Sequence, residues 1–392
     1  MISLKLNLQE AEAKLKILYL TEFFPTTLNL DVHGGIETRT YAIGKLLSSR
    51  HEVYVLAAAE TGKPMRQELA GIKVRRVGWS RQYSRRGAIG ERVSFIISAI
   101  WQGLFWNFDL VEGSGFLGWL PAYILGVVKR KKKVILVADL LENYASDTPK
   151  LAYKAATVLE KYLLNRPWER IICISQVIKE KLLKKHILSK KISVIYCGAE
   201  VQRIQKLESE KKQIFTIGCV SRLVPYKRVA DLIRAIHILR SDKNLVECEI
   251  VGDGEELPNL KQLVKDLKLT RFVHLRGFVE SHQEVIKIVK SCQVFCLPSV
   301  VEGFGISTIE ALSAGLPVVL ADIPISHEVT ENQAVLYFKP GDYRDLARQL
   351  HRLLSDQQLY QKLARETGLS NKYDWKQIAR ETENLYENLC TS

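Results

Sequence analysis

Short apolar runs alternate with amphipathic stretches along the whole chain, and this rhythm restricts the fold more than any other feature. The runs of the first half are KILYL (16–20), EVYVLA (52–57), KVILVA (133–138), RIICIS (170–175) and ISVIYC (192–197). Those of the second half are IFTIGCV (214–220), VECEIVG (246–252), FVHLRG (272–277), QVFCLP (293–298) and PVVLAD (317–322). Runs this apolar, separated by helical patterns, are typical of parallel strands covered by helices on both faces. We therefore predict an α/β protein.

The length of 392 residues favours two domains, because it exceeds what one ordinary hydrophobic core supports. The charged segment VQRIQKLESEKKQ (201–213) separates the two series of runs and is the predicted linker. We predict two Rossmann-like, doubly wound domains, over residues 1–200 and 201–370, that face a central cleft. A C-terminal helix within 371–392 is expected to pack back on the first domain. Ligands of such folds bind at the carboxyl ends of the strands.

The net charge of +14 belongs entirely to the first half of the chain. Residues 1–198 hold 31 Lys and Arg against 17 Asp and Glu, whereas residues 199–392 hold 26 of each. Two segments concentrate the excess, KVRRVGWSRQYSRRGAIGER (73–92) and KRKKK (129–133). Either they form a docking face for an anionic partner, or they are a solvated surface without a function.

The cysteines and the apolar segments favour a cytoplasmic protein. Most of the seven cysteines lie in strand-like apolar runs, which predicts buried free thiols. The first 20 residues carry charges throughout, so we expect no secretory signal, and no run reaches the roughly 18–20 apolar residues of a spanning helix. Cys292 and Cys296 have no second Cys or His cluster beside them, so we expect no metal site.

The stretch SVVEGFGISTIEALSAGLPVV (299–319) places one glutamate on a glycine-rich turn and another in the following helix. The S-x-x-E spacing of Ser307 and Glu310 predicts a helix that begins near Ser307 and ends at Gly315. A helix N-terminus at the carboxyl edge of a parallel sheet binds anions. Glu302 beside it suits a phosphate joined to a polyhydroxylated group, because carboxylates accept hydrogen bonds from sugar hydroxyls. The alternative is a capping box with an incidental acidic residue.

Two further loops are compatible with phosphate. In GCVSRLVPYKRVADLIRAI (218–236), Arg222 and Lys227 lie on a loop between a strand and a helix, where a cation pair neutralises a diphosphate. Each cation alone is more typical of a solvated surface. Gly34 and Gly35 open a helix after the first strand, although ordinary turns use the same pair.

Together these stretches resemble the large retaining family of GT-B glycosyltransferases, the family 4 group, over nearly the full length of the chain. The E-x7-E element of Glu302 and Glu310 with its flanks is the most specific mark. The others are SRLVPYKR, VGDGEELPNLKQLV (251–264), LRGFV (275–279), GGIETRTYAIGKLL and YDWKQIA. The VGDG glycines lack the G-x-G-x-x-G arrangement of a nicotinamide fold.

The resemblance implies that the C-terminal domain binds a UDP- or GDP-sugar donor. Arg222 and Lys227 would clamp the diphosphate, Glu302 would contact the hydroxyls of the transferred sugar, and Glu310 would hold the ribose. The resemblance also places these residues around the donor: Gly35 of the first domain, Phe278 near the base, and Gly303, Phe304, Gly305, Ile306 and Ser307 of the turn. It implies no metal or other cofactor, and retention of the anomeric configuration by front-face attack, with the leaving phosphate helping to deprotonate the acceptor.

One position departs from the family pattern. Members often carry His-Asp at the end of a strand near the donor sugar, and here VILVADLLENY gives Ala138 and Asp139. We include Asp139 among the expected catalytic residues. Either Asp139 or Glu142 serves in that region, or the fine mechanism differs, or catalysis is weakened.

The acceptor is expected on the N-terminal domain, which carries the positive excess. Aromatic and cationic side chains together suit the headgroup region of an anionic membrane. The aromatic residues that accompany the basic segments are Trp79, Trp101, Phe105, Trp106 and Trp119. We therefore predict a glycan or lipid-linked acceptor and peripheral attachment to the cytoplasmic face of a membrane. The alternative is that the tryptophans are core and the cations only solubilise the chain.

No recognisable nucleic-acid module appears in the chain, so we expect no nucleic-acid partner. Three other functions use a similar scaffold. A nucleotide-sugar epimerase would need no acceptor, and a phosphorylase would need pyridoxal phosphate on a lysine. A catalytically weak homologue would bind the nucleotide sugar without turnover.

Overall fold

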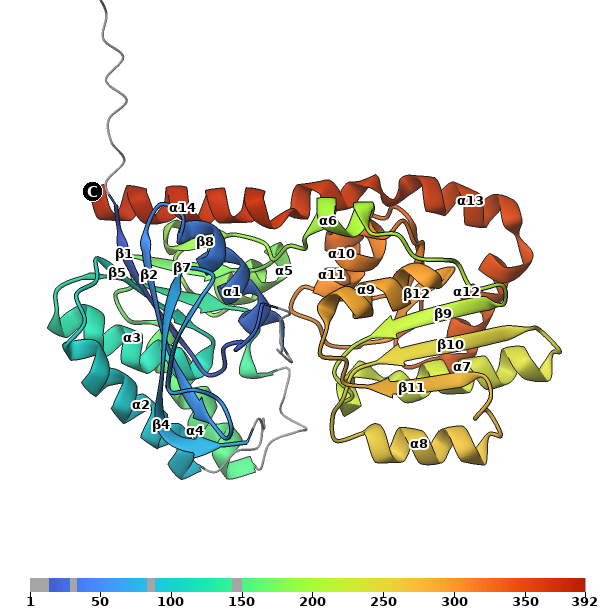
Figure 1. The fold of residues 1–392 in the computed structure, drawn as a ribbon, viewed down its shortest axis with the longest axis horizontal. Coiled ribbons are helices and arrows are strands. Elements are labelled where there is room, and N and C mark those ends of the chain that lie inside the picture. The colour runs from blue at the N-terminus through green and yellow to red at the C-terminus, as the bar shows by residue number, and fades with distance from the viewer. Residues whose placement is uncertain (1–13, 29–33, 83–88, 143–149, 392) are drawn as a thin grey trace, which may run out of the picture.

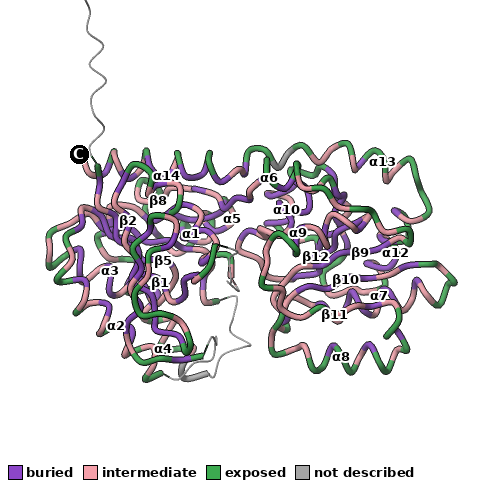
Figure 2. The backbone as a smooth tube through the Cα atoms, viewed as in Figure 1, coloured by how far each residue is buried: buried purple, intermediate pink, exposed green. Residues whose placement is uncertain are grey.

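A computed structural model describes residues 14–28, 34–82, 89–142 and 150–391 of the chain. These residues form two parallel-sheet units that lie side by side, each with helices around its sheet (Figure 1). The predicted fold class, with two Rossmann-like domains, is confirmed. The central strands of both sheets are mostly buried, as their apolar sequences require, whereas the edge strands are partly exposed (Figure 2).

The N-terminal sheet has the strand order β3-β4-β2-β1-β5-β6-β7-β8, and all neighbours are parallel except β3 and β4. Its strands are β1 (Lys16–Thr21), β2 (Glu52–Glu60), β3 (Arg66–Leu69), β4 (Ile72–Arg81), β5 (Leu110–Ser114), β6 (Lys132–Val137), β7 (Arg170–Cys173) and β8 (Ile192–Val194). Its helices are α1 (Gly35–Leu47), α2 (Ile89–Leu104), α3 (Phe116–Val128), α4 (Lys150–Leu164) and α5 (Gln176–Lys184). Because right-handed crossovers from β1 to β2 and from β5 to β6 run in opposite directions along the sheet, α1 and α3 cover opposite faces.

The C-terminal sheet has the order β11-β10-β9-β12-β13-β14 and is parallel throughout. Its strands are β9 (Phe215–Val220), β10 (Val246–Val251), β11 (Val273–Gly277), β12 (Val294–Leu297), β13 (Val318–Ala321) and β14 (Val335–Phe338). The helices of this part are α6 (Val201–Lys206), α7 (Val229–Ser241), α8 (Leu257–Asp266), α9 (His282–Ser291), α10 (Ile306–Ser313), α11 (Pro324–Thr330), α12 (Tyr343–Ser355) and α13 (Gln357–Arg365). Both sheets change direction at their first strand, which is where doubly wound folds bind ligands.

Every predicted strand is present, but β3, β4, β5 and β14 were not predicted. Strand β4 was missed because its sequence, IKVRRVGWSR, has the charges of a surface segment. Two of those cations are in fact buried: Arg76 donates hydrogen bonds to the carbonyl oxygens of Phe24 and Pro25, and Arg81 pairs with Glu22. The interpretation of the whole segment as a solvated or docking surface is therefore wrong for these side chains.

Two of the five aromatic residues assigned to a membrane surface also lie elsewhere. Trp119 is buried in α3, and its indole N–H donates to the carbonyl oxygen of Leu136. Trp106 is half-buried and packs against the ring of Tyr54. Helix α3 is apolar but has only 13 residues. Among the described residues, no helix combines the length and the apolar character needed to cross a bilayer.

The cysteines agree with the prediction of free, buried thiols. All seven are free, and all except the half-buried Cys390 lie in the interior. Burial raises the pKa of the Cys219 thiol, near the end of β9, to about 12. The thiol therefore stays protonated and is a packing group rather than a nucleophile.

Helix α14 (Trp375–Thr391) returns from the C-terminal sheet to the N-terminal one and lies along α1 (Figure 1). Its buried Tyr386 donates a hydrogen bond to Glu112 of β5. Its Glu383 pairs with Arg50 and, at 2.8 Å, with the Nε2 atom of His51. Charged and polar contacts thus hold the end of the chain against the first sheet.

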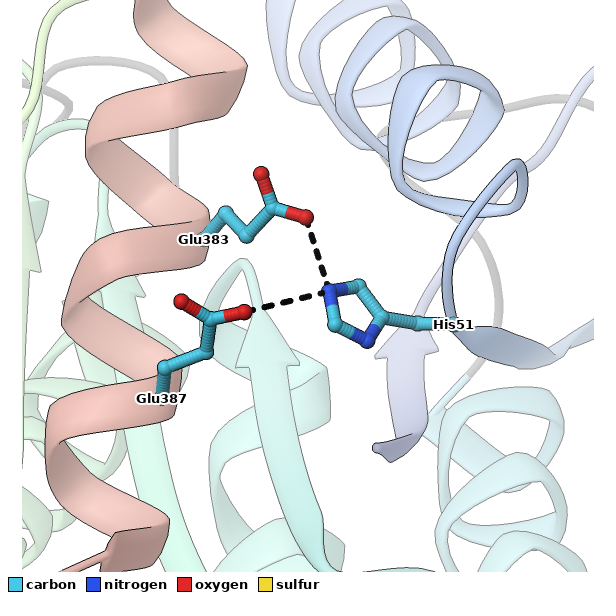
Figure 3. A group of neighbouring side chains, drawn as sticks. All are labelled: His51, Glu383 and Glu387. Atoms are coloured by element: carbon cyan, nitrogen blue, oxygen red, sulfur yellow. Dashed lines mark hydrogen bonds and ion pairs between the residues drawn. The ribbon is translucent and has the colours of Figure 1, made fainter. Parts of the chain in front are cut away.

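The group formed by His51, Glu383 and Glu387 has the composition of a metal site, with ligand atoms within 4.8 Å of one another (Figure 3). Its hydrogen bonds indicate otherwise. The backbone N–H of Leu15 donates to Nδ1 of His51 at 3.2 Å, so the proton of the neutral ring lies on Nε2. A protonated Nε2 donates to Glu383 and offers no lone pair to a metal. This group therefore holds α14 against the first domain.

Candidate functional site

Two neighbouring loops form the candidate site at the carboxyl edge of the C-terminal sheet. Strands β9 and β12 are adjacent, so the loops that follow them, 221–228 and 298–305, lie side by side. The backbone N–H of Val300 donates to the carbonyl oxygen of Tyr226 at 3.0 Å and joins the loops. Lys227 and Glu302 form an ion pair, with only 13% and 11% of their side chains exposed. The structure therefore brings together two of the predicted catalytic residues.

The VGDG glycines support the first of these loops. A Cβ atom on Gly252 would lie 1.9 Å from the carbonyl oxygen of Ser221, and one on Gly254 would lie 2.2 Å from that of Leu223. Both glycines also have positive φ, which other residues rarely adopt. The backbone N–H of Leu223 donates to the carbonyl oxygen of Asp253 at 2.9 Å. Glycine at these positions lets the two loops approach closely and so positions Arg222.

Three polar atoms of the site are buried without a hydrogen-bond partner in the described part of the chain. They are Nε of Arg222 and the hydroxyl oxygens of Ser221 and Ser299. An unsatisfied buried donor costs roughly 1–3 kcal/mol, so folded proteins rarely leave one. A ligand with acceptor oxygens would satisfy these groups.

Helix α10 begins at the candidate site without a side-chain cap. Its N-cap is Gly305, which has φ of 87° and leaves the first turn without a capping side chain. The predicted start near Ser307 is within one residue of the observed start at Ile306. The capping box of Ser307 and Glu310 does not form, because Glu310 bonds to His282 instead. The N-terminus of α10 thus offers backbone N–H groups to an anion.

His282 and Glu310 form a pair beneath the site. Nε2 of His282 lies 2.7 Å from Oε1 of Glu310, whose side chain is 10% exposed. Burial alone lowers the pKa of His282, but the charge of Glu310 and its hydrogen bond outweigh this effect and raise the pKa. The imidazole therefore fixes the orientation of one carboxylate oxygen.

Phe304 lies at the junction of the two domains. Its buried ring packs against Tyr196 of the first domain at 5.8 Å between centroids, and against Tyr373 at 5.3 Å. The side chain therefore anchors the 298–305 loop, and only its backbone remains for a ligand. The side chains of Ser299, Glu302 and Thr308 and the backbone of Gly305 line a small hollow beside this anchor.

Three contacts show that the carboxyl edges of the two sheets face each other. A Cβ atom on Gly303 would lie 2.3 Å from the carbonyl oxygen of Ala138, at the end of β6. One on Gly35 would lie 3.3 Å from the side chain of Ile306. Glu328 of α11 accepts hydrogen bonds from the first backbone N–H groups of α5, including that of Val177 at 2.9 Å.

The remaining predicted residues lie at strand ends around this junction. Asp139 follows Ala138, and its Oδ1 accepts a hydrogen bond from the N–H of Leu140 at 2.8 Å. Phe278 is half-buried directly after β11. At the start of α1, the carboxylate of Glu37 accepts the N–H of Gly34 at 3.1 Å. That turn therefore already holds a carboxylate from its own helix, which disfavours a phosphate there.

Sequence reasoning missed Ser299, His282 and Glu328. Ser299 lies directly before the recognised turn and could have been included with it. His282 opens a helix after Ser281, and nothing in the sequence links it to Glu310. Glu328 contacts α5 across the two domains, which a sequence pattern does not reveal.

Comparison with known proteins identifies the family. Residues 200–368 match the family model "Glycosyl transferases group 1", and residues 33–203 match "Glycosyltransferase Family 4". The chain belongs to this family of glycosyltransferases. It is 28% identical over 226 residues to the phosphatidylinositol N-acetylglucosaminyltransferase gpi3 subunit of Schizosaccharomyces pombe, a match that covers 56% of this chain and 49% of the relative. The chain spans about half the length of the first curated relatives it matches.

Solved glycosyltransferase structures share the fold. Sucrose-phosphate synthase from Thermosynechococcus elongatus superposes with a TM-score of 0.82, at 17% identity, over 96% of this chain and 99% of its own. Anabaena HepE in complex with UDP-glucose superposes with a TM-score of 0.74, at 20% identity, over 95% of this chain and 99% of its own. At these identities the likeness establishes the GT-B architecture.

Proposed function

We propose that this chain transfers a sugar from a UDP- or GDP-sugar to a glycan or lipid-linked acceptor, with retention of the anomeric configuration. One observation carries the proposal: the Lys227–Glu302 pair lies beside Nε of Arg222, which has no hydrogen-bond partner among the described residues, and beside the uncapped start of α10. Cations and a helix N-terminus suit a diphosphate, and a carboxylate suits sugar hydroxyls. Membership of the family and the UDP-glucose bound by HepE support this assignment.

In this proposal, each group of the site binds a different part of the donor. Arg222, Lys227 and the first turn of α10 bind the diphosphate, and Glu302 accepts hydrogen bonds from the transferred sugar. Glu310, held by His282, accepts hydrogen bonds from the ribose. Lys227 then contacts both a phosphate and Glu302, which ties sugar recognition to phosphate binding. The backbone of the turn, from Gly303 to Ser307, and the ring of Phe278 complete the donor site.

The reaction would break the bond between the anomeric carbon and the phosphate oxygen and form one to the acceptor oxygen on the same face. The acceptor proton would pass to the leaving phosphate. Negative charge develops on that phosphate, and a positioned donor at such a charge contributes roughly 10²–10³ in rate. Because Arg222, Lys227 and α10 supply this stabilisation, we propose that no metal ion or other cofactor takes part.

Ala138 favours a second candidate, a nucleotide-sugar-binding homologue with weak turnover. The family often has histidine at this position near the donor sugar. Here the backbone carbonyl of Ala138 contacts Gly303, directly beside Glu302. Donor binding without transfer to glycan or lipid acceptors would favour this candidate.

Calorimetric titration tests the proposal. UDP, GDP and ADP, and then their sugar conjugates, are added to the full chain without metal. We expect tight binding of one nucleotide, strongly weakened in Arg222→Ala and unchanged in Arg234→Ala, a matched control on the half-exposed face of α7. Absence of binding by every nucleotide would refute the assignment of the site. An assay of radiolabelled sugar transfer from the donor to an acceptor extract then distinguishes a transferase from a protein that only binds the donor.

A further inference from the structure

The outward face of α2 is apolar along its whole length. Ile89, Val93, Ile97, Trp101 and Phe105 recur every four residues, the last directly after the helix end, and are between 45% and 73% exposed. Residues at this spacing lie on one face of a helix. The opposite face of α2, with Phe95 and Ala99, packs on the domain. A surface helix of a soluble protein normally presents polar residues at such positions.

Neighbouring elements extend this surface at both ends. At the helix start, Trp79 of β4 is 67% exposed and lies against Gly90, where a Cβ atom would be 3.2 Å from the indole ring. At the helix end, Val127 and Val128 of α3 are 48% and 60% exposed. Lys129 joins the two helix ends by donating to the carbonyl oxygens of Leu104 and Trp106. We call these residues the α2 apolar face: Trp79, Ile89, Val93, Ile97, Trp101, Leu104, Phe105, Val127 and Val128.

Basic side chains adjoin the α2 apolar face. Residues 73–92 contain seven Lys and Arg and one Glu, of which Arg85 and Arg86 lie outside the described residues. Residues 129–133 contain five cations and no acid and follow α3 at the far end of the face, but Lys133 is buried and pairs with Glu169. Although Arg76 and Arg81 of the first segment point inward, Lys73 and Arg130 are exposed. The occupant of this surface must therefore combine an apolar interior with negative charge at its boundary.

We propose that the α2 apolar face docks on an anionic lipid bilayer, with its aromatic and aliphatic side chains in the headgroup boundary and the exposed cations Lys73 and Arg130 over anionic lipids. An interfacial helix binds in this way through buried apolar area and electrostatic attraction. A second copy of the chain fits less well. A two-fold interface places the same patch against itself, and would oppose the basic segments of two domains that each carry a net charge of +14.

Vesicle flotation tests this proposal. The full chain is mixed with vesicles of phosphatidylglycerol and phosphatidylcholine, or of phosphatidylcholine alone. We expect binding to the anionic vesicles that weakens as salt is raised. Ile97→Glu should lower the partition coefficient roughly tenfold or more, because one apolar side chain no longer leaves water and a like charge is added. Leu245→Glu is the matched control, since Leu245 is 68% exposed on the other domain. Its binding should be unchanged.

Three results would overturn the proposal. They are failure of the unmodified chain to bind anionic vesicles, equal binding by Ile97→Glu, and a dimer in sedimentation velocity that Ile97→Glu dissociates. The last would assign the face to a second copy of the chain. Trp101→Ser, with a melting curve for each variant, guards against a folding defect in one of them. The measurement uses neither donor nor acceptor, so this inference does not rest on the proposed glycosyl transfer.

Discussion

The two domains use their cations differently. In the C-terminal domain, Arg222 and Lys227 lie on a loop at the carboxyl end of a strand, beside an acidic turn and a helix N-terminus. In the N-terminal domain, Arg39, Arg76 and Arg81 are buried within the fold. In the domain with the larger positive excess, part of the positive charge thus lies in the interior and has a structural role. Net charge alone does not locate a binding site, whereas position at a strand end and the chemistry of the partners do.

Arg39 shows how deeply the first domain buries charge. It is fully buried, and its guanidinium lies 3.7 Å from the buried carboxylate of Glu112. None of its three nitrogens has a hydrogen-bond partner among the described residues. Glu112 also accepts hydrogen bonds from Ser114 and from Tyr386 of α14. Arg39 and Glu112 therefore belong to the contact between α14 and the first sheet.

Arg222→Ala gives the largest expected effect and the sharpest test of this comparison. We expect the kcat/KM for the donor to fall roughly 100–1,000-fold, about 3–4 kcal/mol, because the charge on the leaving diphosphate loses a positioned donor. The melting temperature should hardly change, since Nε of Arg222 makes no hydrogen bond within the described residues. Arg76→Ala should do the reverse and lower the melting temperature first. If both variants lost stability and neither lost donor binding selectively, the comparison would fail.

Glu302→Gln should lower the turnover number about a hundredfold, while nucleotide affinity changes little. The carboxylate is proposed to contact the transferred sugar, so the free nucleotide does not sense it directly. Steady-state kinetics with the donor and calorimetry with the free nucleotide measure the two effects separately. An unchanged turnover number would remove the assigned role of Glu302. An equal loss in both measurements would show that Glu302 acts mainly through Lys227.

Glu383→Ala tests the structural use of charge in the first domain. The substitution removes the nearer carboxylate partner of buried His51, while Glu387 remains 3.8 Å from its Nε2 atom. Breaking a buried pair costs about 3–5 kcal/mol. Arg50 is half exposed and is solvated after the loss, so we expect only about 2 kcal/mol. Urea unfolding measures the difference. Asn384→Ala, at the adjacent exposed position of α14, is the control and should leave stability nearly unchanged.

The sequence pattern was sufficient to predict the strands whose burial is continuous and the turn that carries Glu302. Apolar runs predict parallel strands because both faces of a parallel sheet are covered. It failed for β4, where Arg76 and Arg81 reach polar partners from inside the sheet and the apolar pattern is broken. The partners of a charge are set by the folded chain, and the sequence shows only the charge.

For the candidate site, the sequence likewise predicted individual residues but not all of their contacts. Glu302 and Lys227 were each recognised on separate loops, and the adjacency of β9 and β12 explains why they meet. The pairing of Glu310 with His282 was missed because S-x-x-E spacing equally predicts a capping box. The contact of Gly303 with Ala138 depends on how the two domains sit against each other. A local motif holds no information about that arrangement.

His282→Gln has the smallest expected effect and depends on pH. The pKa of His282 is raised above its ordinary value of 6.5, since the charge of Glu310 outweighs burial, with a further contribution from Glu200 and an opposing one from Arg203. A raised pKa in the folded state stabilises the protein fully below the unfolded pKa and loses this contribution as pH rises through the folded value. The variant should therefore be destabilised by roughly 1 kcal/mol near pH 6 and by less near pH 9. Urea unfolding at both pH values measures this, with His351→Gln as an exposed control. A loss that is equal at both pH values would mean that His282 supports Glu310 as a neutral hydrogen-bond donor and not as a cation.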